Sequence, residues 1–195
     1  MVQTANSALF RPGTTGLHLA LLRGINVGGK NKLPMAELVA MFVEAGCADV
    51  RTYIQSGNVL FTVAPSRRKE LADVITKRIA EHFGFRVPVI LRTADELRQT
   101  VAGNPFLKSG VDTAAFHVAF LADAPPKRLV AALDIGRSPG DSFDVRGREI
   151  YLCLPNGVAK TKLTNAYFDS TLATVSTLRN WRTVLKLAEM AQAVS

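Results

Sequence analysis

The chain is poor in cysteine and in aromatic residues, and it contains no long hydrophobic run. Two of its 195 residues are cysteines, and aromatic residues make up 7% of it. Two cysteines without metal-type spacing cannot build a disulfide framework or a cysteine-based zinc site. No apolar run approaches the roughly 18 residues that cross a bilayer, and no secretory signal opens the chain. We therefore expect a cytoplasmic protein with no membrane segment, in which Cys47 and Cys153 are buried free thiols.

Acidic residues are scarce relative to basic ones. The 24 Lys and Arg against 16 Asp and Glu give a net charge of +8, which favours anionic partners without identifying one. Paired catalytic carboxylates, a nucleophile elbow and a cysteine-nucleophile signature are all lacking, and the histidines have no partners at ligand spacing. The sequence thus predicts no metal site and no cofactor, and it leaves open whether the protein is an enzyme.

The first half of the chain alternates between short apolar runs and amphipathic stretches. Strands are expected at 17–22, 50–55, 59–63 and 87–91, with helices from Pro34 to a Gly46 cap and at about 67–82. Pro88 favours an edge position for the last strand, because proline cannot donate to a ladder. The order β-α-β-β-α-β is the split βαβ arrangement of ferredoxin-like domains.

The second half repeats much of this plan. Phe116–Leu121 echoes Leu17–Leu22, which indicates an internal duplication. A helix at 126–134, a hairpin of 142–145 with 149–154, and helices at 162–173 and 179–192 follow, so the order is βαββαα with the final strand missing. We predict an α+β protein of two ferredoxin-like halves, the second modified by an extra C-terminal helix. The predicted divisions are a flexible arm at 1–15, half one at 16–92, a connecting helix and linker at 93–112, and half two at 113–195.

The loop at 23–32 is rich in glycine and lysine and contains no acidic residue. It leads into a helix N-terminus, and free amides, the helix dipole and basic side chains together favour an anion. Gly24–Asn31 matches the phosphate-binding loop G-x-x-x-x-G-K-[S/T] except that Asn31 replaces the magnesium-binding hydroxyl, which argues against a nucleotide triphosphatase. A tight turn with no ligand is the alternative interpretation.

Two further clusters fall near this loop or could reach it. In a split βαβ sheet the end of the first strand lies beside the turn at 55–58, which adds amide and hydroxyl groups. Arg179-Asn180-Trp181 would join if the last helix folds back, and core packing is the alternative for it. The predicted ligand-binding residues are Arg23, Gly24, Asn26, Gly28, Gly29, Lys30, Asn31, Gln55, Ser56, Asn58, Arg179 and Asn180.

Four segments carry a resemblance to a known family: LLRGINVGGKNKLPMAEL, RTYIQSGNVLF, HVAFL and RNWRTVLKLAEM. On these the chain resembles the bacterial family known as domain of unknown function 1697, over about residues 17–192. The resemblance implies an α+β fold with two ferredoxin-like halves, and it assigns no activity and no catalytic residue. Arg182 stands where the family usually has asparagine.

Three functions follow from these features. The first is binding of a phosphate- or carboxylate-bearing small molecule at the loop. Nucleic-acid binding is an alternative that rests on net charge and sheet type, although strands one and three lack the exposed aromatic pair of RNA-recognition sheets. A structural or protein-interaction role is the third.

Overall fold

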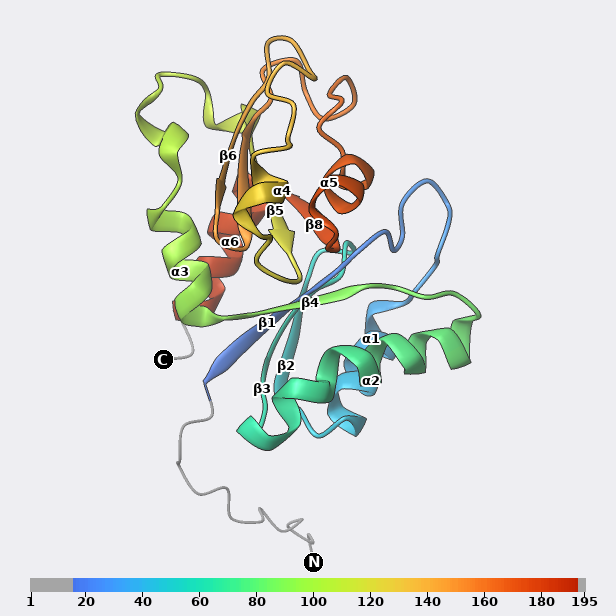
Figure 1. Ribbon diagram of the computed structural model, residues 1–195. Coiled ribbons are helices and arrows are strands. Elements are labelled where there is room, and N and C mark those ends of the chain that lie inside the picture. Colours follow the sequence, from blue (N-terminus) through green and yellow to red (C-terminus); the bar gives the residue numbers. More distant parts are fainter. Residues whose placement is uncertain (1–15, 193–195) are drawn as a thin grey trace, which may run out of the picture.

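Residues 16–192, which the computed structural model describes, form two four-stranded antiparallel sheets surrounded by six α-helices (Figure 1). This arrangement confirms the predicted α+β class. The flexible arm predicted at residues 1–15 lies outside the described residues. Within those residues, no helix combines the length and the apolar character that a membrane crossing requires.

The first sheet has the strand order β2-β3-β1-β4. Its strands are β1 (Leu17–Leu22), β2 (Ala48–Tyr53), β3 (Asn58–Thr62) and β4 (Val89–Thr93). Helices α1 (Met35–Glu44) and α2 (Pro65–Phe83) cover one face, where Phe42, Phe61 and Ile75 are buried in a shared core. As Pro88 indicated, the strand that follows it lies at the edge.

The second sheet has the corresponding order β6-β7-β5-β8. Its strands are β5 (Phe116–Leu121), β6 (Ser142–Arg146), β7 (Glu149–Cys153) and β8 (Ser176–Asn180), and α4 (Lys127–Val130) and α5 (Asn165–Leu172) pack on its outer face. The prediction that the final strand is missing is wrong, because β8 pairs with β5. Its buried residues include Ser176, Thr177 and Arg179, so a search for apolar periodicity does not detect it.

Each half ends in a helix that packs between the two sheets. α3 (Ala94–Ala102) follows β4, and α6 (Trp181–Gln192) follows β8. The two helices pack against each other, and they lie side by side at the left of Figure 1. The predicted connecting helix and the predicted extra helix therefore occupy the same place in their respective halves. The rest of the connection contains two short 3₁₀ turns, η1 (Pro105–Lys108) and η2 (Thr113–Ala115).

A central core joins the two halves. It contains Leu19 of the first sheet, Val118 of the second, and Trp181 of α6. The core-packing interpretation of Trp181 is therefore confirmed. Cys47 and Cys153 lie in different halves as buried free thiols. Because the core draws on both sheets, we expect the halves to unfold together.

Candidate functional site

The glycine-rich loop after β1 contains a tight turn of its own. The Lys30 amide donates to the Val27 carbonyl at 3.0 Å, which closes a turn over Gly28 and Gly29. These two glycines have φ values of 58° and 76°, in the left-handed region that glycine enters without strain. Their Cβ positions face open space, so the turn needs glycine for its backbone shape and not for room.

Two asparagines hold this loop in shape. The Asn26 amide donates to the carbonyls of Leu33 and Gln55, at 2.9 Å each, and its oxygen accepts from the Leu33 amide at 2.8 Å. Asn31 closes the base of the loop by donating to the Gly24 carbonyl at 2.9 Å. The loop and the turn after β2 therefore lie together, as the split βαβ pattern predicted. Asn26, Gly24 and Asn31 shape this edge through internal bonds.

The basic side chains of the loop have different surroundings. Lys30 and Lys32 are exposed, and no ion pair of either is found within residues 16–192. Arg23 instead forms an ion pair with Asp169 of α5, and its Nη1 also donates to the Ser176 carbonyl at 3.3 Å. The loop, drawn in blue at the right of Figure 1, thus lies beside α5 of the other half. Asp169 is a residue that the sequence did not indicate, because it lies far from the loop along the chain.

Arg179 is the buried link between β8 and the end of the first sheet. Arg179 is 8% exposed, and none of its hydrogen-bond partners within residues 16–192 is acidic. All of its nitrogens donate to neutral oxygens, at 2.6 to 3.3 Å. The acceptors are Asn58 Oδ1, Thr177 Oγ1 and the carbonyls of Leu22, Ser56, Gly57 and Leu178. Burial lowers the pKa of Arg179 to about 10, so the guanidinium remains charged at neutral pH.

The turn between β2 and β3 lies directly against this guanidinium. Asn58 is buried, accepts from Arg179 Nε at 2.6 Å, and donates to the Tyr53 carbonyl and to Ser56 Oγ. Gln55 is exposed and offers only its carbonyl, to Asn26. The side chains of Asn58 and Ser56 are therefore committed to shaping the turn.

Asn180 does not join the loop, although its neighbour Arg179 does. Its side-chain oxygen accepts from the Thr183 amide at 2.8 Å and so caps α6. Because Asn180 and Arg179 are successive residues of β8, their side chains point to opposite faces of the sheet. The prediction that the two residues act together assumed a helix here, and the strand separates them.

The other half holds an arginine in the matching place. Arg92 of β4 pairs in register with Leu19, as Arg179 of β8 pairs with Val118. Arg92 is fully buried and donates through Nη2 to two carbonyls of the second half, at 2.8 and 2.9 Å. Each half therefore sends one arginine into the other. The carbonyls that receive Arg92 belong to Leu121 and Arg148.

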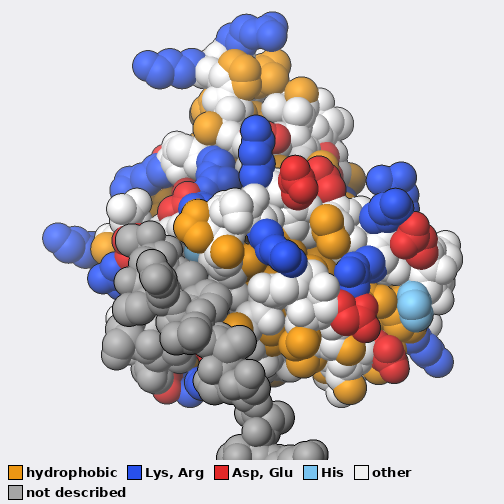
Figure 2. Space-filling model, turned by 90° about the horizontal axis from the view of Figure 1, so that it is seen from below, with side chains coloured by type: hydrophobic (Ala, Val, Ile, Leu, Met, Phe, Trp, Pro, Cys, Tyr) orange, Lys and Arg blue, Asp and Glu red, His pale blue; other side chains and the backbone are white. Residues whose placement is uncertain are grey.

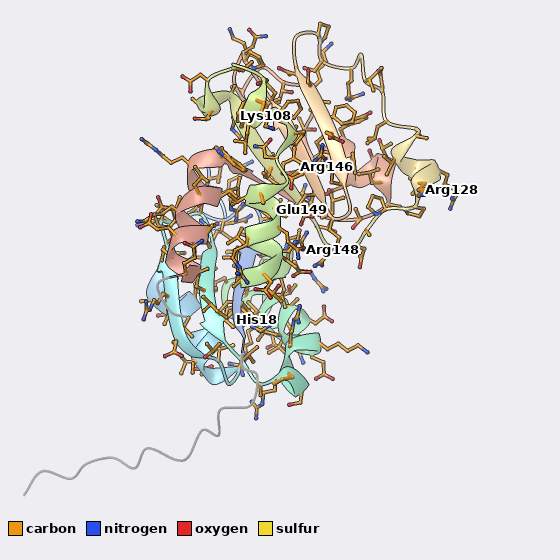
Figure 3. The ribbon with its side chains drawn as sticks, turned by 90° about the vertical axis from the view of Figure 1, so that its left-hand side faces the viewer. His18, Lys108, Arg128, Arg146, Arg148 and Glu149 are labelled. Atoms are coloured by element: carbon orange, nitrogen blue, oxygen red, sulfur yellow. The ribbon has the colours of Figure 1, made fainter. Side chains whose placement is uncertain are left out.

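One difference separates the two arginines. Arg92 Nε donates to the Glu149 carboxylate at 2.8 Å, whereas Arg179 Nε meets the neutral amide of Asn58. Each acceptor is the first residue of the third strand of its half. Glu149 begins β7 and pairs with Phe120, and Asn58 begins β3 and pairs with Leu21. Figure 3 shows Glu149 and Arg148 beside α3. The buried charge is thus neutralised in half two and left without an acid in half one.

Two open grooves lie elsewhere on the surface. A groove of about 430 Å³ lies between α3 and the β6–β7 hairpin, and its Arg148 forms an ion pair with Glu96. Another, of about 280 Å³, lies between α1 and α2, where Arg78 forms an ion pair with Glu44. Neither groove is lined by the loop or by its partner turn. In the described part of the chain, no three His, Cys, Asp or Glu side chains gather as a metal site would require.

A family model described as "Protein of unknown function (DUF1697)" matches residues 17–151, which is more than half of the chain. The chain belongs to this family. Among solved structures it is similar to a conserved bacterial protein, SP0830, from Streptococcus pneumoniae. The two are 24% identical with a TM-score of 0.72, over 92% of this chain and 99% of that one. This likeness shows the fold. No curated protein matches.

Proposed function

We propose that this DUF1697 protein binds an anionic small molecule at the edge formed by residues 23–33 and 54–57, which we call the loop edge. The observation that carries the proposal is the buried charge of Arg179, which lies under this edge and has no acidic partner within residues 16–192. A phosphate or carboxylate at the loop edge would supply the missing negative charge. Catalysis is no part of the proposal.

The size of the effect follows from Coulomb's law. A unit anion about 8 Å from the guanidinium gains about 2 kcal/mol at an effective dielectric constant near 20. The gain corresponds to roughly a thirtyfold increase in affinity. Lys30 and Lys32 at the exposed rim add to the same field, and salt screens their contribution more strongly than that of Arg179.

The orientation of one peptide at the loop edge also supports the proposal. The carbonyl of Ser56 accepts from Arg179 at 3.0 Å. Since the C=O and N–H of a trans peptide point in opposite directions, the Gly57 amide proton points away from the guanidinium. Arg23 uses only Nη1 in its bonds to Asp169 and Ser176, which leaves Nε and Nη2 for a ligand.

We further infer that the two halves are ferredoxin-like units that arose by duplication. The repeated strand order, the matching final helices and the reciprocal arginines support this inference. In such a pair, Asn58 and Glu149 are equivalent positions that have diverged. Glu149 neutralises the buried arginine in half two, as the negative charge of a ligand would in half one.

Asn58→Asp tests the proposal, with Glu149→Gln as the matched control in the other half. The aspartate keeps an oxygen for Arg179 Nε and places a negative charge under the loop edge. It also loses the amide donor to the Tyr53 carbonyl, so an unchanged amide spectrum of the ligand-free variant is required before its affinity is compared. We expect inorganic phosphate, titrated against 15N-labelled protein, to shift the amide signals of residues 27–30 and 57 in the natural chain. Asn58→Asp should weaken this binding at least tenfold, and Glu149→Gln should leave it within twofold.

Two results would overturn the proposal. One is the absence of phosphate or carboxylate binding at millimolar concentration, and the other is equal binding by the natural chain and Asn58→Asp. Lys30→Ala with Lys32→Ala provides a second test and should weaken phosphate binding. Both side chains are exposed, so we expect the double variant to fold. Binding of unrelated RNA with a steep salt dependence, and no effect of phosphate, would support nucleic-acid binding instead. The face shown in Figure 2 carries intermingled acidic and basic side chains, which does not favour that outcome.

A further inference from the structure

Two aliphatic side chains project into solvent at the loop edge. Val27 is 64% exposed and Ile54 is 50% exposed. Each is next in sequence to one end of the hydrogen bond from the Asn26 amide to the Gln55 carbonyl, so both flank the same contact. Single exposed aliphatic residues are common on protein surfaces. Two of them beside the same group of cationic side chains need a separate explanation.

Ile54 also has an unfavourable backbone conformation. Its φ is +48°, in the left-handed region, where a β-branched residue is a rare outlier. Glycine or asparagine would fill this position at lower cost. Because the side chain is half exposed, folding recovers little of that cost by burying it. Such outliers concentrate where a ligand is held, and this one lies on the turn that faces the loop.

We propose that the ligand of the loop edge is an amphiphilic small molecule, in which an aliphatic or aromatic group adjoins the phosphate or carboxylate. This inference rests on the proposed function and adds the class of ligand to it. Val27 and Ile54 contact the apolar group, while Lys30, Lys32 and the charge of Arg179 hold the anion. Ile54 then recovers in the complex the burial that it lacks in the free protein.

A soluble ligand fits this edge better than a membrane surface. Recognition of an anionic bilayer uses clusters of about four to eight basic residues. The loop edge has three basic side chains, which are the exposed Lys30 and Lys32 and an Arg23 whose charge is partly balanced by Asp169. Two aliphatic side chains match a small apolar group more closely than a bilayer interior.

A homologous series of ligands tests the proposal. The affinities of inorganic phosphate, ethyl phosphate, butyl phosphate and hexyl phosphate would be compared by titration of the full chain. We expect a gain of roughly threefold to fourfold for each added CH₂ until Val27 and Ile54 are covered. Ile54→Gly and Val27→Ser should flatten this dependence on chain length, measured in each variant relative to its own affinity for inorganic phosphate. Ile54→Gly also relieves the left-handed strain, so it is expected to fold.

Val43→Ser serves as the control, because Val43 is 53% exposed on α1 and lies away from the loop edge. It should retain the full dependence on chain length. If inorganic phosphate does not bind, the proposed function itself fails. If phosphate binds and all alkyl phosphates bind equally, or if the variants keep the chain-length dependence, only the amphiphilic proposal is refuted. Binding to phosphatidylserine vesicles without binding to hexyl phosphate would also refute it, in favour of a membrane surface.

Discussion

Replacing Arg179 with methionine should destabilise the protein by about 3 to 5 kcal/mol. Methionine fills much of the same volume but offers no donor to the oxygens that the guanidinium now bonds. Four of these, on Leu22, Ser56, Gly57 and Asn58, belong to the other half of the chain. Each buried acceptor left without a donor costs about 1 kcal/mol or more. The loss of the desolvated charge offsets part of this cost, since burial already lowers the pKa of Arg179 to about 10.

Urea unfolding followed by circular dichroism measures this loss. The expected result is a lower midpoint with an unchanged m-value, because the same surface is exposed on unfolding. Arg179→Lys should lower the free energy of unfolding by less than Arg179→Met, since an ammonium keeps the charge and three donors. Arg92→Met should cost at least as much, because it strips the Glu149 carboxylate of its partner. A loss below about 1 kcal/mol for Arg179→Met would refute the view that this arginine joins the halves.

Three further outcomes follow from the structure. Burial raises the pKa of Cys47 to about 11, so a disulfide reagent at pH 8 should label this thiol only on unfolding; rapid labelling in native buffer would contradict this. Burial opposes ionisation of Glu96, but the Thr93 amide and Arg148 outweigh this effect and hold the pKa of Glu96 below its usual value. The stability that the ionised carboxylate contributes should therefore be lost as pH falls through that pKa. Glu96→Gln should narrow the difference in urea midpoint between pH 7 and pH 3.5. Gly57→Ala should lower the free energy of unfolding in urea by about 2 kcal/mol or more, because the new Cβ would lie 2.6 Å from the Leu22 Cβ at a φ of +74°. Gly28→Ala places its Cβ in open space and should lower it by about half as much. Equal losses for the two variants would show that the contact with Leu22 is absent.

The parts of the fold that could be predicted are those in which buried residues are apolar. β1 and β5 are apolar except for one histidine each, and both have the predicted bounds. β8 was missed because Thr177 and Arg179 fill buried positions in it, and the burial of Arg179 depends on acceptors supplied by the first half. The helix predicted at 126–134 is a single turn, Lys127–Val130, followed by irregular structure. The prediction therefore overestimated the length of this helix.

The loop edge could be predicted in position but not in chemistry. Its glycines and its neighbouring turn follow from local sequence and from the split βαβ order, which is why loop and turn were expected together. Two facts depend on partners from the distant half of the chain: that Asp169 pairs with Arg23, and that Arg179 lies beneath the turn.

Under the proposed function, the acceptors of the two buried arginines determine where an anion is favoured. Glu149 supplies a carboxylate to Arg92, and Asn58 gives Arg179 only a neutral oxygen. Exchanging the two acceptors, with Asn58→Asp and Glu149→Gln in one chain, should move the uncompensated charge from half one to half two. Half two should nevertheless not gain phosphate affinity from this exchange. At its β6–β7 turn Arg148 already forms an ion pair with Glu96, and β5 is not followed by a loop like the one that carries Lys30 and Lys32.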